Sequence, residues 1–173
     1  PHFLYNSLTA IQQLCDVNPK LAVKAIDSFS SFLRGNIDSL STSKPIPFEK
    51  ELEHVRNYLM IEQLRFGPRL TVVIDTPVTD FSIPSLTVQP VVENAVHYGI
   101  TKREHGGTII ITTQRKRNSV IVTVHDNGTG YDPLIAPMND KKSHVGLDNV
   151  RMRLAMQCGG TLEIETKNGS GTI

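Results

Sequence analysis

The fold is decided by one stretch of the chain, Gln89-Pro90-Val91-Val92-Glu93-Asn94-Ala95-Val96-His97-Tyr98-Gly99. Positions 86, 89, 90, 93, 94 and 97 recur at helical spacing, so a helix over Leu86 to Tyr98 carries them on one face. That face is polar where a core helix would be apolar. Glu93 can accept a proton or orient water, and Asn94 offers a neutral oxygen to a hard cation such as Mg²⁺. The pair therefore predicts a site for a metal-bound polyphosphate.

Length and composition define the class of protein. The chain has 173 residues, 39% of them hydrophobic, which suits one large domain or two small ones. The formal net charge is +1 and no basic stripe is present, so nucleic acid is not the expected partner. No run approaches the roughly 20 apolar residues of a membrane helix. The chain begins without Met and stops as a strand starts, so we expect a fragment whose membrane segment, if any, lies upstream.

Residues 1–66 have helical periodicity. Apolar side chains at Leu4, Leu8, Ile11 and Cys15 mark a first helix. A second starts at Asn18-Pro19 and is expected to end at Gly35, before a Ser-rich connector from Ser39 to Ser43. A third runs from Phe48 to Phe66, closed by Gly67-Pro68, with Glu62 and Arg65 expected as a surface pair. These helices must pack on the rest of the chain or on a second copy of it.

Residues 67–173 mix strands and helices. The sequence predicts strands at Leu70–Asp75, Thr108–Gln114, Val120–Asp126 and Thr161–Thr166, helices at Leu86–Tyr98 and Gly146–Gln157, and a loop from Asn127 to His144. This order favours an α+β sandwich with helices on one face of a mixed sheet. It lacks the G-x-G-x-x-G and G-K-[ST] patterns, which argues against a dinucleotide fold or a P-loop.

The segment after the strand ending at Asp126 suits a nucleotide. An acceptor-only carboxylate can take a hydrogen bond from an exocyclic amine such as that of adenine. Gly128 and Gly130 let the backbone approach a planar ring closely. Gly146-Leu147 is expected to open a helix whose first amides hold phosphate oxygens, and Lys142 can meet the same charge. A long loop between such elements often acts as a lid.

These motifs, taken in order, resemble the catalytic end of a LytS-type sensor histidine kinase over nearly the whole chain. The matching segments are Pro1-His2-Phe3-Leu4-Tyr5-Asn6-Ser7-Leu8, the phospho-acceptor motif; Tyr58 to Phe66, the linker helix; Gln89 to Gly99, the N box; Asp126 to Gly130 and Val145 to Leu154, two glycine boxes; and Gly169 to Thr172, the start of the last box. The resemblance implies a Bergerat-type ATP-binding domain at 67–173. It also implies a helical phospho-acceptor and dimerisation segment at 1–66.

The resemblance also implies roles for single residues. Asn94 holds Mg²⁺, Glu93 assists within the phosphate site, and Asp126 reads the adenine amine. Around them, the residues implied to shape the pocket or contact the nucleotide are Gly128, Gly130, Gly146, Leu147, His97 and Lys142. His2 receives the γ-phosphoryl group of ATP, and Asn6, one helical turn away, hydrogen-bonds the imidazole or a phosphoryl oxygen. The protein would be the cytoplasmic portion of a bacterial integral membrane kinase. It would act as a homodimer and pass its phosphoryl group to an aspartate of a response-regulator receiver domain.

Two other functions fit parts of the pattern. The first is a nucleotide-binding module that uses ATP as a conformational clamp without phosphorylating itself, a reading that leaves His2 without a purpose. The second is a protein-serine kinase on a similar ATP fold. The chain also departs from the family pattern, with His97-Tyr98-Gly99 where a basic residue usually precedes His-Gly, and with His144 where a small residue or glycine commonly precedes Val145-Gly146.

Overall fold

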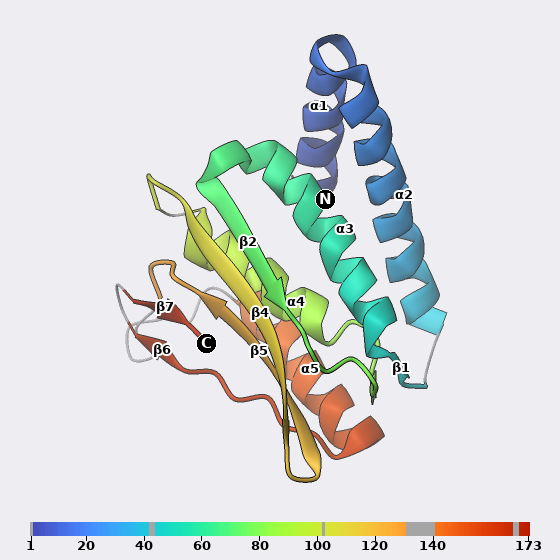
Figure 1. The fold of residues 1–173 in the computed structure, drawn as a ribbon, viewed down its shortest axis with the longest axis vertical. Helices are drawn as coiled ribbons and strands as arrows, with labels where there is room; N and C mark the ends of the chain where they lie inside the picture. The colour runs from blue at the N-terminus through green and yellow to red at the C-terminus, as the bar shows by residue number, and fades with distance from the viewer. Residues whose placement is uncertain (1, 42–43, 102, 131–140, 168–169) are drawn as a thin grey trace.

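The computed structural model describes the chain except for residues 1, 42–43, 102, 131–140 and 168–169. For residues 2, 40, 41, 98, 141–145 and 167 it describes the backbone alone. The first part consists of the helices α1 (His2–Val17), α2 (Pro19–Ser41) and α3 (Phe48–Phe66). Asn18 caps α2 through a 3.1 Å hydrogen bond from the backbone N–H of Leu21 to its side-chain oxygen. Figure 1 shows that α1 and α2 form a hairpin that extends beyond the sheet.

Helix α2 continues past Gly35 to Ser41, so the predicted end at Gly35 and the connector beginning at Ser39 are wrong. The glycine serves packing rather than termination. A Cβ at position 35 would lie 2.8 Å from Nε2 of His54, which belongs to α3. The missing side chain lets the two helices approach each other, and their mutual contact supports the helix beyond this point.

The second part is built on a five-stranded sheet in the order β2–β4–β5–β7–β6. The strands are β2 (Leu70–Asp75), β4 (Gly107–Lys116), β5 (Ser119–Asp126), β6 (Thr166–Lys167) and β7 (Gly171–Thr172). Strand β2 runs parallel to β4, and the other neighbours are antiparallel. A separate pair joins β1 (Ile46–Pro47) to β3 (Ser82–Ile83). The predicted hairpin and the strand at 70–75 are confirmed.

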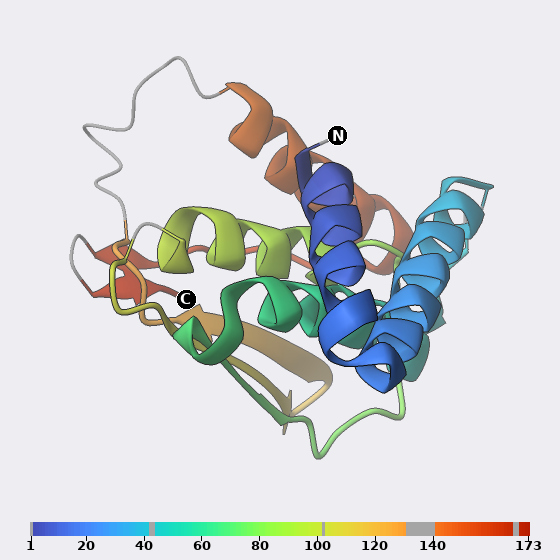
Figure 2. The ribbon, with the colours of Figure 1, turned by 90° about the horizontal axis from the view of Figure 1, so that it is seen from above.

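The remaining helical elements are α4 (Val88–Asn94), the π-helical segment η2 (Ala95–Ile100), the short 3₁₀ turn η1 (Gly67–Arg69) and α5 (Lys141–Cys158). Figure 2 shows α3, α4 and α5 on the same side of the sheet. Strand β4 buries Ile109, Ile111 and Thr113 in alternation, as a sheet covered on one face requires. The predicted α+β class, with helices on one face of a mixed sheet, is therefore confirmed.

Two predicted boundaries in the last third of the chain differ from the structure. Helix α5 begins at Lys141 rather than Gly146, because no glycine or proline interrupts residues 141–145. The predicted strand at Thr161–Thr166 is extended chain up to Glu165, and only Thr166 belongs to β6. A strand needs a neighbouring strand to pair with. Among the described residues, β7 pairs with β5 on one side and with Thr166 and Lys167 on the other. Next to this pairing, the backbones of Glu165 and Ile173 are hydrogen-bonded to each other.

Candidate functional site

Asp126 occupies the last position of β5 and is 3% exposed. Its Oδ1 atom accepts a 2.8 Å hydrogen bond from the backbone N–H of Gly128. Burial raises the pKa of the Asp126 carboxyl, while the Gly128 hydrogen bond, the charge of His125 and the backbone of Thr172 oppose that shift. A buried carboxylate with spare acceptor capacity can take a hydrogen bond from an amine donor of a bound ligand.

Glycine backbone surrounds this carboxylate. A Cβ at Gly99 would lie 2.5 Å from Oδ1 of Asp126, and a Cβ at Gly128 would collide with the Cα of Gly99. Gly130 has a positive φ of 57°. The loop after β5 therefore lies directly on η2 with no side chain between them. This arrangement fits a planar ring held against the backbone beside Asp126.

Asn94 is the last residue of α4 and is half-buried. The helix widens immediately after it into η2, where the N–H of Thr101 bonds to the carbonyl of Val96 across five residues. The same segment contains Gly99, which contacts Asp126. The two residues predicted to share a magnesium nucleotide thus belong to neighbouring elements. Their convergence on one ligand stays a prediction.

The chemistry of Asn94 suits Mg²⁺. Its carboxamide makes no side-chain hydrogen bond to another described residue, so its oxygen is available as a ligand. Mg²⁺ is usually held by one or two protein oxygens together with phosphates and water. The described residues contain no group of three or more His, Cys, Asp or Glu that forms a complete protein cage. A phosphate-bound ion with a single protein ligand is consistent with that composition.

Glu93 is connected to the helices of residues 1–66 through a hydrogen bond and through its charge. Its carboxylate accepts a 2.8 Å hydrogen bond from Nε2 of Gln89, and the same amide donates to Oδ1 of Asn36 in α2 at 3.1 Å. Burial raises the pKa of Glu93, while the hydrogen bond from Gln89 lowers it. Glu93 also raises the pKa of Glu62 in α3. This network connects the predicted phosphate site to α2 and α3.

Glu62 and Arg65 are not the surface pair that the sequence predicted, because Glu62 is 2% exposed. Nη1 of Arg65 donates to Oε1 of Glu62 at 3.1 Å, and Nη2 lies 3.1 Å from Oε2. Burial raises the pKa of Glu62 from 4.5 to about 7, with Arg65 opposing and Glu93 adding to the shift. The sequence contained the signal, since Val55, Leu59, Glu62 and Phe66 recur along one helical face.

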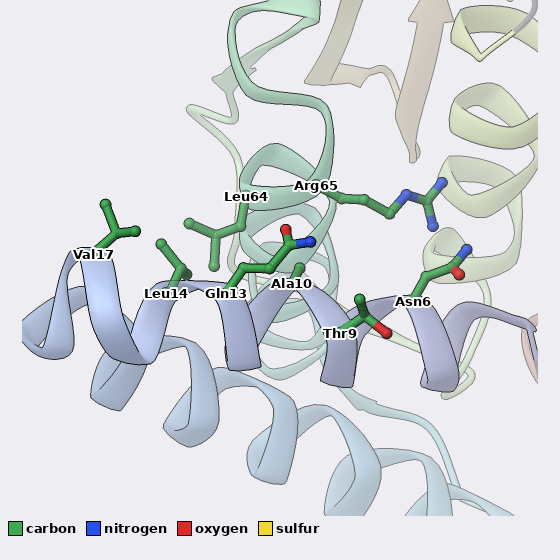
Figure 3. Close-up of a pocket in the computed structure, with 8 residues that line it drawn as sticks. All are labelled: Asn6, Thr9, Ala10, Gln13, Leu14, Val17, Leu64 and Arg65. Atoms are coloured by element: carbon green, nitrogen blue, oxygen red, sulfur yellow. The ribbon is translucent and has the colours of Figure 1, made fainter.

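The first turn of α1 contains His2, whose side chain lies outside the described atoms. The adjacent Phe3 packs on Phe32 at 4.9 Å and on Tyr58 at 5.2 Å between ring centroids, which fixes this turn against α2 and α3. Asn6 and Arg65 line a cavity of about 350 Å³ between α1 and α3. Figure 3 shows the guanidinium of Arg65 extending toward the side of α1 that carries Asn6.

The other predicted residues lie on the surrounding elements. His97 is exposed on η2. Gly146 and Leu147 are half-buried in the second turn of α5, so their N–H groups are not among the first four of the helix, which lack intrahelical partners. The backbone of Lys142 belongs to the first turn of α5, and its side chain lies outside the described atoms. Their contacts with a nucleotide stay predictions.

Comparison with known families agrees with this architecture. Residues 1–70 match the histidine kinase family, and residues 82–173 match the histidine kinase-, DNA gyrase B-, and HSP90-like ATPases. The chain belongs to this ATPase family. The family match assigns ATP as the nucleotide of the domain over 82–173.

Named relatives cover nearly the whole chain. Sensor histidine kinase YpdA of Escherichia coli is 37% identical over 95% of this chain and 30% of its own length. Sensor protein LytS of Oceanobacillus iheyensis is 31% identical over 97% of this chain and 30% of its own length. Bacillus subtilis YwpD is 37% identical over 99% of this chain, which spans 64% of YwpD. The predicted resemblance to LytS-type kinases is confirmed.

Solved structures agree on the fold. The histidine kinase domain of an Erythrobacter litoralis blue-light activated kinase aligns over 99% of this chain and 91% of its own, with a TM-score of 0.58 and 16% identity. Acinetobacter baumannii histidine kinase AdeS aligns over 99% of this chain and 94% of its own, with a TM-score of 0.57 and 15% identity. Among the described helices, none is both long enough and apolar enough to cross a bilayer.

Proposed function

We propose that this chain is the ATP-dependent catalytic region of a two-component sensor histidine kinase. Residues 1–66 would be the phospho-acceptor and dimerisation segment, and residues 67–173 the ATP-binding domain. One observation carries the proposal: the buried carboxylate of Asp126 lies on glycine backbone beside the segment that continues from Asn94. The match of residues 1–70 to histidine kinases supports the phospho-acceptor assignment.

In this proposal the nucleotide is held by two residues. Asp126 accepts a hydrogen bond from the adenine amine, and Asn94 gives its side-chain oxygen to Mg²⁺. When bound, the ion neutralises charge on the phosphates, which is the main requirement of phosphoryl transfer. The glycines at 99 and 128, by having no Cβ, let the loop after β5 lie directly on η2 and so form the backbone wall beside Asp126 against which the ring would lie.

His2 in its neutral form is the proposed nucleophile. An imidazole nitrogen forms a bond to the γ-phosphorus while the bond from that phosphorus to the β–γ bridging oxygen breaks, so ADP leaves. Asn6 hydrogen-bonds the imidazole or a phosphoryl oxygen. The raised pKa of Glu93 makes its carboxylate a better acceptor for the proton of the attacking imidazole. The phosphoryl group then passes to an aspartate of a response-regulator receiver domain.

Exposed apolar side chains support a homodimer through the helical hairpin. They lie on both of its helices, and the set is Leu4, Tyr5, Leu8 and Val17 on α1 with Val23, Ile26 and Ile37 on α2. Helical faces of this kind are usually covered in the working assembly. The chain spans about 30% of the sensor kinases YpdA and LytS. From its similarity to these sensor kinases, we also propose that it is the cytoplasmic portion of a bacterial membrane kinase.

The test is incubation with ATP labelled on the γ-phosphate in the presence of Mg²⁺. We expect label on the protein that is acid-labile and alkali-stable, as a phosphoramidate bond requires, and its loss in His2→Gln. The matched control is His105→Gln, which removes an exposed imidazole from the loop before β4 and should leave labelling unchanged.

Other outcomes would assign a different function. ATP turnover with no label on the protein would favour a conformational clamp. Acid-stable label on a second protein would favour a serine kinase. Retention of label in His2→Gln would remove the proposed acceptor.

A further inference from the structure

Glu51 contacts the start of α4 from a distant part of the chain. It lies in the first turn of α3 and is completely buried. Its Oε1 accepts hydrogen bonds from the backbone N–H groups of Thr87 and Val88 at 2.8 Å and of Gln89 at 3.2 Å. Its Oε2 accepts the N–H of Leu86 at 2.9 Å. One carboxylate therefore satisfies four consecutive amides at the entry to the helix.

Arg153 of α5 contacts the carbonyls of the same segment. Its Nη1 donates to the carbonyl of Ser85 at 2.7 Å, and its Nη2 donates to the carbonyl of Leu86 at 2.5 Å. Burial lowers the pKa of the Arg153 guanidinium, and the negative charge of Glu51 opposes that shift. Each of the two peptide groups that flank Leu86 is thus held at both ends, its N–H by the Glu51 carboxylate of α3 and its carbonyl by the Arg153 guanidinium of α5.

The backbone at Leu86 needs such support. Its φ is 54°, in the left-handed region that a leucine rarely adopts because Cβ approaches the following carbonyl. Strained residues of this kind persist where surrounding interactions determine the conformation. Glu51, Leu86 and Arg153 are referred to below as the Leu86 junction.

We propose that Glu51 and Arg153 are positioning residues that hold Leu86 in its left-handed conformation and thereby set the placement of α4, and of Asn94 at its end, relative to α3 and α5. The part of this inference that concerns ATP rests on the proposed function. Helix α3 is the last helix of the segment 1–66, and α5 follows the loop predicted to cover the nucleotide. A shift of either helix is transmitted to α4 through the junction, because Glu51 bonds directly to the first two amides of α4 and Arg153 bonds to the carbonyls of the residues that lead into it.

The experiment compares Glu51→Gln and Arg153→Lys, singly and together, with the parent in Mg²⁺-ATP binding by calorimetry. Glutamine presents an N–H₂ group to one of the four donors, and lysine cannot donate to both carbonyls in the guanidinium geometry. We expect each single variant to weaken ATP binding about tenfold, and the double variant to lose little more than either single, because both act on one backbone segment. Controls are Glu53→Gln and Arg151→Lys, which make the same changes at exposed positions.

A rescue separates positioning from general stabilisation. Glycine adopts a positive φ without strain, so Leu86→Gly should restore most of the ATP affinity lost in Glu51→Gln or Arg153→Lys. If the two residues contributed only packing stability, removing the leucine side chain would worsen both variants. Absence of rescue, or effects of the two single variants that multiply in the double, would overturn the proposal.

A second readout does not depend on nucleotide. Hydrogen exchange of the amides of residues 86–89 should be faster in Glu51→Gln than in Glu53→Gln, without ATP, and slower again when Leu86→Gly is added. If the parent binds no ATP, the proposed function fails while this measurement still judges the junction. Equal exchange in the two glutamine variants would refute it. If Glu51→Gln does not fold, Arg153→Lys is compared with Arg151→Lys in the same way.

Discussion

The carboxylate of Asp126 and the backbone of Gly99 are in direct contact, because a Cβ at position 99 would lie 2.5 Å from Oδ1 of Asp126. The contact joins the end of β5 to η2, which continues from the helix that ends at Asn94. Through this packing, the residue predicted to bind the adenine amine and the predicted magnesium ligand belong to neighbouring elements. Each part of the proposed site can be tested from this arrangement.

Gly99→Ala should lower the free energy of unfolding by about 1–3 kcal/mol, because the new methyl group overpacks the Asp126 carboxylate. ATP affinity should fall with it. Urea unfolding and calorimetry measure the two effects. Gly146→Ala is the matched control for stability, since a Cβ there meets no described atom within 4 Å and alanine favours the helix. A fully stable Gly99→Ala protein would contradict the tight contact.

Asp126→Asn should weaken ATP binding about tenfold or more, because an N–H₂ group replaces an oxygen that would accept the adenine amine. Binding of GTP, which has no amine at that ring position, should change less. Competition binding with both nucleotides measures the selectivity. Asp75→Asn makes the same change at the end of β2, where the side chain is exposed, and should have no effect. Unchanged selectivity would remove Asp126 from the adenine site.

Asn94→Ala should reduce the apparent affinity for Mg²⁺ in the ATP complex about tenfold, because the ion loses its protein oxygen. Binding of ATP in the presence of EDTA should be nearly unchanged. Magnesium titration at fixed ATP separates the two quantities. Asn57→Ala, which removes a half-buried carboxamide from α3, is the control. Equal magnesium dependence in Asn94→Ala and the parent would show that this residue is not the ligand.

Glu62 should make stability depend on pH. Its pKa is raised from 4.5 to about 7 by burial, so the folded state binds the proton more tightly than the unfolded state. The contribution of Glu62 to the free energy of unfolding is therefore fully present below about pH 4.5 and is lost as pH rises through about 7. At about 1.4 kcal/mol for each pH unit, a pKa raised from 4.5 to about 7 corresponds to a loss of about 3.5 kcal/mol. Glu62→Gln should flatten the urea-derived stability profile over this range, whereas Glu53→Gln should not. If the free energies of unfolding of the parent and Glu62→Gln changed in parallel with pH, the raised pKa of Glu62 would be refuted.

Phe3→Ala should destabilise the first turn of α1 by about 2 kcal/mol, because Phe3 loses ring contacts with Phe32 and Tyr58. The rate of label incorporation on His2 should fall several-fold while ATP affinity stays the same, since the nucleotide residues lie on other elements. The control Gln12→Ala removes an exposed side chain from the same helix. A parallel loss of labelling and ATP affinity would mean that Phe3 acts through the whole fold.

Local patterns predicted most of the elements. The run at 70–75 and the hairpin ending at Asp126 are strands because β-branched residues are concentrated there, and α3 begins and ends where Pro47 and Gly67 stand. The same patterns placed three boundaries wrongly, and two of these were predicted from a glycine. Gly35 fits a helix end in sequence but packs against His54, and Gly146 fits a helix start although α5 begins five residues earlier. A glycine indicates a terminus or a close approach equally well, and only the neighbouring helix distinguishes them.

The amino-acid sequence by itself determined the order of the motifs and the family, because both depend on residues close together in the chain. Tertiary structure decided which charged side chains are buried and which backbone groups they bind. Glu51 reaches amides 35 to 38 residues away, and Arg153 reaches carbonyls 67 and 68 residues away. Helical periodicity places Glu51 and Glu62 on the apolar face of α3 but does not name their partners. Those partners depend on how α3, α4 and α5 pack, since the free energy of a buried charge is set by its neighbours in space.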